Sequence, residues 1–269
     1  WDASAFLDVA ALRPRFNDTS GYSPSRGLRG FAFHPNYESN GLVYTAHKEN
    51  QDGSTPEYGT AYFDSEFVLA EWDFNQLTDG EPTYRQLFRV RFEHNFHTVQ
   101  QLGFAPDGYL YVCLGDNGAK TGGVSYYSQL RNVSDVSNVG QNFDTIQAGV
   151  IRIDPMDPSD LTDDELALAG LKRSANGRFS IPLDNPFVGW PAHKEELFAK
   201  GFRNPLSLSF SPSGKPVIAD VGEQTMEEIN VLVRGGNYGW PNREGTFLVA
   251  WCDQVDGSSL GADASMVWM

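Results

Sequence analysis

The chain has 269 residues, which is enough for one large domain with a packed core. Its 35 acidic and 20 basic residues give a net charge of -15, and this anionic balance argues against binding to nucleic acids or to anionic lipid headgroups. No stretch reaches the roughly 20 consecutive apolar residues of a transmembrane helix, so no membrane insertion is expected. Two cysteines, Cys113 and Cys252, are too few for a disulfide scaffold or a cysteine-built zinc site.

The two ends of the chain carry no closing element. The sequence opens inside an apolar segment and stops at Met269 with no turn or polar tail, so we expect residues 1–269 to form one incomplete domain. The first ten residues lack the basic start and apolar run of a signal peptide. If the protein is exported, we expect its signal to have been removed.

Short alternating apolar segments, bounded by Gly, Pro, Asn or Asp, predict strands and hairpins rather than long helices. Three hairpins, beginning at residues 31, 102 and 208, share one design: an aromatic-bearing strand, a proline-containing turn and a second apolar strand. Further strands are predicted at residues 67–74, 87–92 and 149–153. The acidic stretch 154–164 lacks the central glycine of an EF-hand and is expected to be a surface loop. A capping box at residues 162–165 then predicts a short helix over residues 166–173.

Repetition of one hairpin predicts an all-β fold built from similar sheets. The turn prolines Pro35, Pro106 and Pro212 are unevenly spaced, which fits a unit of roughly 50 to 60 residues with one unit missed between the last two. Sheets of this size that stack around an axis form a β-propeller, because neighbouring sheets protect one another's edges. We therefore expect an incomplete propeller with about four to five blades in this chain.

A histidine and a carboxylate flank the second hairpin. His94 and His97 stand where the chain enters it, on a loop that a propeller would place at the mouth of its central channel. Because the ends of such a hairpin come together, Asp116 on the returning strand can accept the Nδ1 proton of His97 and leave Nε2 free as a base. A buried histidine with a satisfied hydrogen bond and a turn aspartate would explain the same residues. The remaining histidines are predicted to be structural or exposed: His34, His47 and His193.

The region from Gly201 to Pro241 carries two further patterns. Arg203 stands just before a strand and can stabilise an anion, although a surface ion pair is the alternative. No GxSxG, HExxH or CxxC motif occurs, and the glycine-rich run at residues 115–121 lacks the spacing of a phosphate-binding loop. The second pattern is a cluster of acidic side chains and turn carbonyls around Gly222, Glu223, Glu227 and Glu228. Oxygen ligands of this kind suit Ca²⁺ better than a transition metal. An ordinary acidic turn is the alternative.

Taken together, these motifs resemble the glucose/sorbosone dehydrogenase family. Its members are soluble sugar dehydrogenases that depend on pyrroloquinoline quinone (PQQ) and fold as six-bladed propellers. The matching segments run in family order across nearly the whole chain. They cover residues 27–35, 97–118, 201–205, 227–230 and 235–241. The resemblance therefore implies an all-β, six-bladed propeller of which residues 1–269 form a part.

The resemblance also implies roles for individual residues. His97 matches the general base that takes the proton of the anomeric hydroxyl, and Asp116 matches the carboxylate that orients this base. Arg203 and Asn204 match residues that bind PQQ on its quinone side, with the arginine stabilising charge on the reduced ring. The remaining matches concern calcium: Gly222 and Glu223 match the carbonyl ligands of the Ca²⁺ that also binds PQQ, and Glu228 with the carbonyl of Tyr238 matches a second Ca²⁺ site.

Several positions depart from the family pattern. Gln100 and Gln101 replace a small residue and an arginine beside the base, which changes the floor of the pocket. Glu223 replaces a proline, although any residue retains the carbonyl that the site needs. The side chains that grip the carboxylates of PQQ in the family are expected beyond Met269. The other departures are Ser25 and Thr121, where glutamines often contact PQQ, and Phe96, where a carboxylate commonly precedes the base.

Two functions are compatible with these residues. The first is a periplasmic or secreted quinoprotein oxidoreductase that oxidises an aldose to its lactone, with hydride transfer to PQQ and an external quinone or cytochrome as electron acceptor. The second is a propeller retained as a binding module for a protein or glycan, as in the hedgehog-interacting relatives of the family. Retention of His97, Asp116, Arg203 and Asn204 favours the enzyme, because a binding surface needs no base. A lactone hydrolase on a similar propeller is not supported by the order of the motifs.

Overall fold

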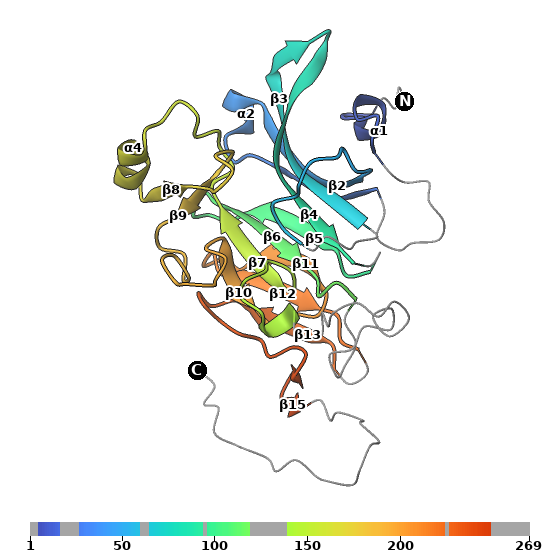
Figure 1. The fold of residues 1–269 in the computed structure, drawn as a ribbon, viewed down its shortest axis with the longest axis vertical. Coiled ribbons are helices and arrows are strands. Elements are labelled where there is room, and N and C mark those ends of the chain that lie inside the picture. Colours follow the sequence, from blue (N-terminus) through green and yellow to red (C-terminus); the bar gives the residue numbers. More distant parts are fainter. Residues whose placement is uncertain are drawn as a thin grey trace.

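Three successive antiparallel sheets form the framework of the described part of the protein. The computed structural model describes residues 5–16, 27–59, 65–93, 96–118, 139–223 and 226–248 (Figure 1). The first sheet has the strand order β1-β2-β3-β4, the second β10-β7-β6-β5 and the third β11-β12-β13. Their bounds are β1 Leu28–Phe33, β2 Leu42–Glu49, β3 Ser65–Thr78, β4 Glu81–Phe92, β5 Val99–Phe104, β6 Leu110–Leu114, β7 Gly149–Ile153, β10 Leu197–Lys200, β11 Pro205–Phe210, β12 Pro216–Asp220 and β13 Glu228–Val231.

Smaller elements connect and flank these sheets. Two ribbons, β8–β9 and β14–β15, each contain two strands. Among the described residues, no helix is long and apolar enough to span a membrane. The bounds are α1 Val9–Leu12, α2 Tyr37–Asn40, η1 Val139–Gln141, α4 Asp163–Leu168, β8 Leu171–Arg173, β9 Ser180–Pro182, β14 Arg243–Glu244 and β15 Phe247–Leu248.

The three predicted hairpins are confirmed as β1–β2, β5–β6 and β11–β12. Each begins a sheet, and each turns at a glycine with positive φ: Gly41 at 66°, Gly108 at 87° and Gly214 at 81°. Glycine adopts this left-handed backbone without the steric cost that a Cβ would add. The strands predicted at residues 67–74, 87–92 and 149–153 are also confirmed, as parts of β3 and β4 and as β7.

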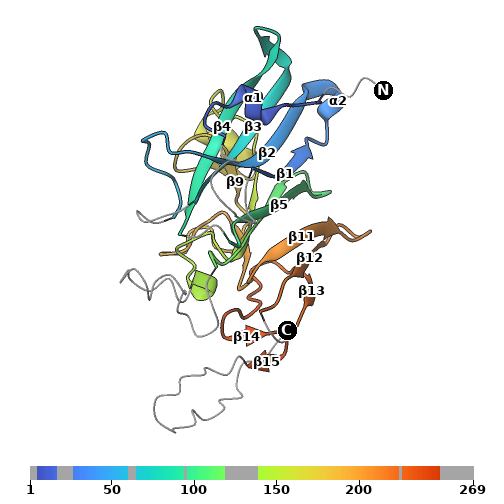
Figure 2. The same ribbon diagram turned by 90° about the vertical axis from the view of Figure 1, so that its right-hand side faces the viewer.

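The first strands of the three sheets lie side by side. β1 packs against β5, and β5 packs against β11 (Figure 2). Successive sheets that meet along their first strands are arranged as blades around a common axis, so the protein is part of a β-propeller and the predicted incomplete propeller is confirmed. The assignment of residues 1–269 to a single domain stays a prediction.

Within the part of the chain that the structure describes, fewer sheets are present than the expected four to five blades. The described residues form two four-stranded sheets and one three-stranded sheet. Among the described residues between the second and third hairpins there is no further four-stranded sheet, and the chain between β7 and β10 is an insertion within the second sheet. This insertion holds α4 and the β8–β9 ribbon, and it lies to one side of the sheets (left in Figure 1).

The helix of the insertion is shorter than expected. The predicted capping box is present, because Thr162 Oγ1 accepts a hydrogen bond from the Glu165 backbone and the Glu165 carboxylate accepts one from the Thr162 backbone. The helix nevertheless ends at Leu168, and residues 171–173 form β8. Gly170, with φ at 76°, allows the chain to leave the helix, and pairing with β9 then fixes Leu171–Arg173 as a strand.

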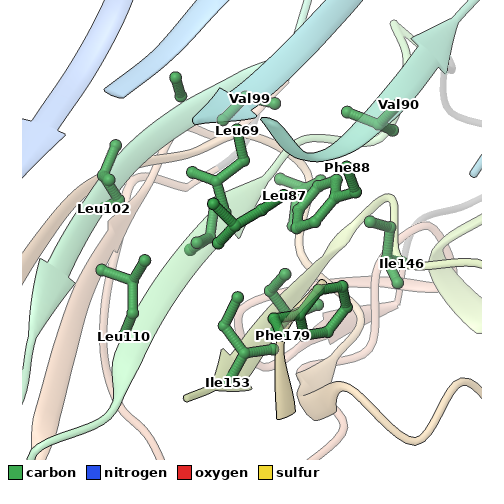
Figure 3. Close-up of a cluster of buried hydrophobic side chains, with 14 of the residues drawn as sticks. Leu69, Leu87, Phe88, Val90, Val99, Leu102, Leu110, Ile146, Ile153 and Phe179 are labelled. Carbon is green, nitrogen blue, oxygen red and sulfur yellow. The ribbon is translucent and has the colours of Figure 1, made fainter. Parts of the chain in front are cut away.

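Two apolar clusters hold the sheets together. The larger cluster lies between the first two sheets and joins residues from both, including Leu69, Phe88, Leu102 and Ile153 (Figure 3). A second cluster joins the second and third sheets and contains Cys113. Cys113 is a fully buried free thiol whose pKa is raised by burial, so it acts as a core residue. Cys252 lies outside the described residues.

Two glutamines tie the first strands of the blades to each other. Arg29 Nη2 on β1 donates to Gln100 Oε1 on β5 at 2.5 Å, and the Leu208 backbone N on β11 donates to Gln101 Oε1 at 2.6 Å. These are the two positions at which the sequence departs from the family pattern beside the predicted base. The departures therefore supply polar contacts between neighbouring blades.

We expect Gln101→Leu to lower the free energy of unfolding by about 1–3 kcal/mol, because it leaves the N–H of the buried Leu208 without its acceptor. Urea denaturation of purified protein measures the change. Gln76→Leu is the matched control, since Gln76 is exposed near the tip of the β3–β4 hairpin and its change is expected to stay within about 0.5 kcal/mol. Equal effects of the two substitutions would contradict a tie between blades.

Candidate active site

His97 lies against a buried carboxylate at the start of the second blade. Its Nδ1 is 2.7 Å from Asp116 Oδ1, as the hairpin predicted. The His97 side chain is 18% exposed and that of Asp116 is fully buried, so one edge of the imidazole can still meet a ligand. His97 has a φ of 48°, an uncommon conformation for a residue with a Cβ. Gly115 permits this approach, because a Cβ there would lie 2.3 Å from the His97 carbonyl oxygen.

Three donors surround the carboxylate of Asp116. Oδ1 accepts from the Gly118 backbone at 2.9 Å as well as facing His97, and Oδ2 accepts from Trp240 Nε1 at 2.7 Å. Because Asp116 is the acceptor in this arrangement, we assign the proton of neutral His97 to Nδ1. Nε2 then carries a lone pair and can accept a proton from a ligand.

Trp240 is a member of the site that the sequence analysis did not assign. It is 2% exposed, its backbone N donates to the Gly201 carbonyl at 3.0 Å, and its carbonyl accepts from Gln141 Nε2 at 2.7 Å. The Arg203 guanidinium carbon lies 5.5 Å from the centre of its ring, within the range of a cation–π contact. Trp240 thus contacts both the carboxylate that orients His97 and the predicted anion-binding arginine. The only sequence signal was its place in the motif at residues 235–241.

A second buried carboxylate fixes Arg203 and Asn204. Their backbone N–H groups donate to Asp220 Oδ2 at 2.9 Å and Oδ1 at 2.6 Å. Burial raises the pKa of Asp220 to about 7, although these two hydrogen bonds act in the opposite direction. The Arg203 carbonyl accepts from the Asp116 backbone at 2.8 Å, which brings the predicted arginine beside the predicted base and its partner.

Two side-chain polar atoms of Arg203 and Asn204 have no hydrogen-bond partner among the described residues. They are Arg203 Nε and Asn204 Oδ1, and both are buried. An unpaired buried polar atom costs about 1–3 kcal/mol, and in native proteins it calls for an explanation. These two atoms, an N–H donor and an oxygen acceptor without partners, belong to neighbouring residues on the segment that hydrogen-bonds the Asp116 backbone, and they fit a polar ligand that supplies the missing partners. This observation favours the predicted cofactor contacts of Arg203 and Asn204.

The predicted calcium positions are brought together only in part. Gly222, Glu228 and Tyr238 line one small cavity of about 10 Å³, a volume suited to a single water or ion, whereas Glu223 does not line it. The Gly222 carbonyl accepts from Arg203 Nη1 at 2.9 Å, and Glu228 accepts from Asn230 Nδ2 and the Gly245 backbone. Within the described part of the chain, no group of three or more His, Cys, Asp or Glu side chains is arranged to hold a metal ion. Calcium binding stays a prediction.

The other residues singled out in the sequence lie in different environments. Phe96 is 41% exposed next to the base. His47 is buried in the first blade, where Nε2 lies 3.2 Å from Glu49 Oε1, so it is structural. Ser25, His94 and Thr121 lie outside the described residues.

Comparison with known proteins agrees with the fold. Residues 17–144 and 160–247 match the family described as Glucose / Sorbosone dehydrogenase. This match covers most of the chain, and the chain belongs to this family. The description of this family indicates sugar-dehydrogenase-like oxidoreductases, and proteins with other names are also similar to the chain.

The chain is similar both to a protein named as a sugar dehydrogenase and to proteins named as hedgehog-interacting or HIPL proteins. HIPL1 protein of Arabidopsis thaliana is 30% identical over 92% of this chain and 37% of its own length. Quinoprotein glucose dehydrogenase B of Acinetobacter calcoaceticus is 28% identical over 85% of the chain and 42% of its own length. Hedgehog-interacting protein of Mus musculus is 28% identical over 67% of the chain and 22% of its own length. The chain thus spans about two fifths or less of the length of these relatives.

A solved structure supports the fold. The apo form of the soluble aldose sugar dehydrogenase of Escherichia coli superimposes with a TM-score of 0.55 at 21% identity, covering 81% of this chain and 50% of that protein. At this identity the likeness shows the fold alone.

Proposed function

We propose that the complete protein is a quinoprotein that oxidises the anomeric hydroxyl of an aldose to a lactone. The observation that carries this proposal is a base held by Asp116, His97, together with two unpaired polar atoms, Arg203 Nε and Asn204 Oδ1, on the segment whose backbone hydrogen-bonds Asp116. A binding surface has no need of this combination. The name of the Acinetobacter relative supports the same chemistry.

In this proposal His97 Nε2 accepts the proton of the anomeric hydroxyl as the C1–H bond is broken. Asp116 stabilises the resulting imidazolium through Nδ1 and keeps the ring in place. Arg203 and Asn204 would hold PQQ, which supplies the acceptor for the hydride of C1. The positive charge of Arg203 would stabilise negative charge on the cofactor. The sugar gains a carbonyl at C1 and becomes the lactone.

The proposal includes calcium, a location and an electron acceptor. The carbonyls of Gly222 and Glu223 would hold the ion next to PQQ, and Glu228 with the Tyr238 carbonyl would hold a second ion, since oxygen ligands of this kind suit Ca²⁺. A dehydrogenase that acts on external sugars would work in the periplasm or outside the cell. An external quinone or cytochrome would take up the electrons.

A non-catalytic binding module is the second candidate. The similarity to HIPL1 and Hedgehog-interacting protein and the altered residues Phe96, Gln100 and Gln101 favour it. In that case a protein or glycan would be recognised and no sugar would be oxidised.

The two candidates separate in one experiment on the complete protein. PQQ and Ca²⁺ are added, the absorption spectrum is recorded, and a panel of aldoses is tested for reduction of the quinone. We expect reduction in the wild type and in the control His34→Ala, and PQQ binding without reduction in His97→Ala. Absence of PQQ binding in the wild type would refute the quinoprotein and leave the binding module.

A further inference from the structure

A second candidate site lies outside the His97 region. A cavity of about 520 Å³ opens between the β8–β9 ribbon, Tyr58 and residues 193–196. This volume is within the range of small-ligand sites, roughly 300–1,000 Å³. The buried side chains of Tyr58, Phe179 and Ile181 provide its apolar lining.

The charged lining of this cavity is balanced. Three cationic and three anionic side chains surround it, so a ligand with a net charge of either sign would meet three groups of like charge. A ligand without net charge fits this lining best. The six residues are Lys172, Arg173, Lys194, Glu57, Glu195 and Glu196.

The polar groups at the cavity retain capacity for both kinds of hydrogen bond. Lys172 Nζ donates to Glu195 Oε2 at 2.5 Å, and an ammonium group has three N–H donors. Glu196 Oε1 accepts from Tyr58 at 2.6 Å, and a carboxylate has about four acceptor positions. His193 Nδ1 lies 2.8 Å from the Pro191 carbonyl and must donate to it, which leaves Nε2 as an acceptor in neutral His193. Hydroxyl groups both donate and accept, so a polyol can use all of these partners.

An exposed aromatic ring stands beside the cavity. Trp190 is 59% exposed and its ring packs edge-on against His193, with 5.6 Å between the ring centres. Its loop is held in place, because the Gly189 backbone donates to Glu195 Oε1 at 2.9 Å and the Trp190 backbone to the Phe187 carbonyl at 3.0 Å. A solvent-facing indole on a loop whose backbone is held in this way offers an apolar face on which the C–H face of a sugar ring can pack.

We propose that this cavity and Trp190 form a binding site for a neutral saccharide of one or two sugar rings. The apolar lining and Trp190 meet the C–H faces of the sugar, and Lys172, Glu195 and Glu196 bind its hydroxyls. Neither His97 nor Arg203 lines the cavity. The site is therefore separate from the candidate active site and does not rest on the proposed oxidation.

Calorimetric titration of the complete protein, prepared without PQQ, with methyl β-D-glucopyranoside and with cellobiose tests the proposal. We expect saturable binding that Trp190→Ala and the double variant Lys172→Met/Glu195→Gln each weaken at least tenfold. Trp190 is exposed, so its substitution keeps the test valid even if the double variant fails to fold. The matched control Lys215→Met/Glu81→Gln changes exposed residues of the same types away from the cavity and should bind as the wild type does.

Three results would overturn the proposal. One is the absence of saturable binding of either saccharide. Another is binding that the cavity variants leave unchanged and His97→Ala removes, which would place the sugar in the active site alone. The third is binding of zwitterionic glycine or glutamine in place of the saccharides, because the balanced charges would then recognise an amino acid. Failure of sugar oxidation with intact binding here would refute the proposed function only.

Discussion

Asp116→Asn in the complete protein is expected to slow sugar oxidation by about 10²- to 10⁴-fold while PQQ still binds. Two donors, His97 Nδ1 and Trp240 Nε1, face the two oxygens of this carboxylate. An amide has one oxygen and one NH₂ group, so its NH₂ must meet one of these donors. When it faces His97, Nδ1 must become the acceptor and the imidazole proton moves to Nε2, which removes the base. When it faces Trp240, the neutral amide no longer supplies the negative charge that stabilises the imidazolium. The rate of quinone reduction under single-turnover conditions measures the effect.

Asp107→Asn is the control for this variant. Asp107 also accepts hydrogen bonds, from Tyr111 and Arg152, but it lies on the far turn of the same hairpin and contacts neither His97 nor Trp240. We expect its sugar oxidation to be unchanged. A rate for Asp116→Asn within threefold of the wild type would show that His97 needs no orienting carboxylate, or that it is not the base.

The contact between His97 and Asp116 could be predicted because it depends on local geometry. Both residues belong to one hairpin, and the pairing of β5 with β6 brings its ends together. The positive φ of His97 could not be predicted in this way. It depends on the close approach of Gly115, which exists only after the two strands have paired.

Contacts between distant segments were missed for a related reason. Trp240 meets Asp116 only because the third blade returns to the second, and no periodicity in the sequence encodes that contact. Likewise, the sequence indicates that Gln101 alters the pocket, whereas in the structure it accepts a hydrogen bond from the Leu208 backbone and so connects two blades. The insertion after β7 has strand-like and helical segments of its own, so its length was mistaken for a missing repeat.

A buried ionic network in the first blade is the other place where one substitution should have a large effect. Arg89 has a side-chain exposure of 1% and contacts Glu66 Oε1 at 2.7 Å, Glu49 Oε2 at 2.6 Å and Asp52 Oδ2 at 3.0 Å. Burial alone would raise the pKa of Glu49, but hydrogen bonds from His47 and Arg13 hold it below its ordinary value. Glu49 therefore stabilises the fold above its ordinary pKa of about 4.3, and this contribution is lost as the pH falls.

Arg89→Met is expected to lower the free energy of unfolding by about 3–5 kcal/mol at pH 7, because Glu49 and Glu66 remain buried without their shared cation. Arg15→Met is the matched control, since the Arg15 side chain is 49% exposed and its ion pair with Asp52, at 3.4 Å, is expected to contribute less than about 1 kcal/mol.

Urea denaturation at pH 7 and pH 4 measures both variants. The loss in Arg89→Met should shrink at pH 4, because the variant has lost one of the cations that hold the pKa of Glu49 down, so its buried Glu49 takes up a proton more readily than that of the wild type. A loss of equal size at both pH values would mean that Arg89 stabilises the blade by packing and not by charge.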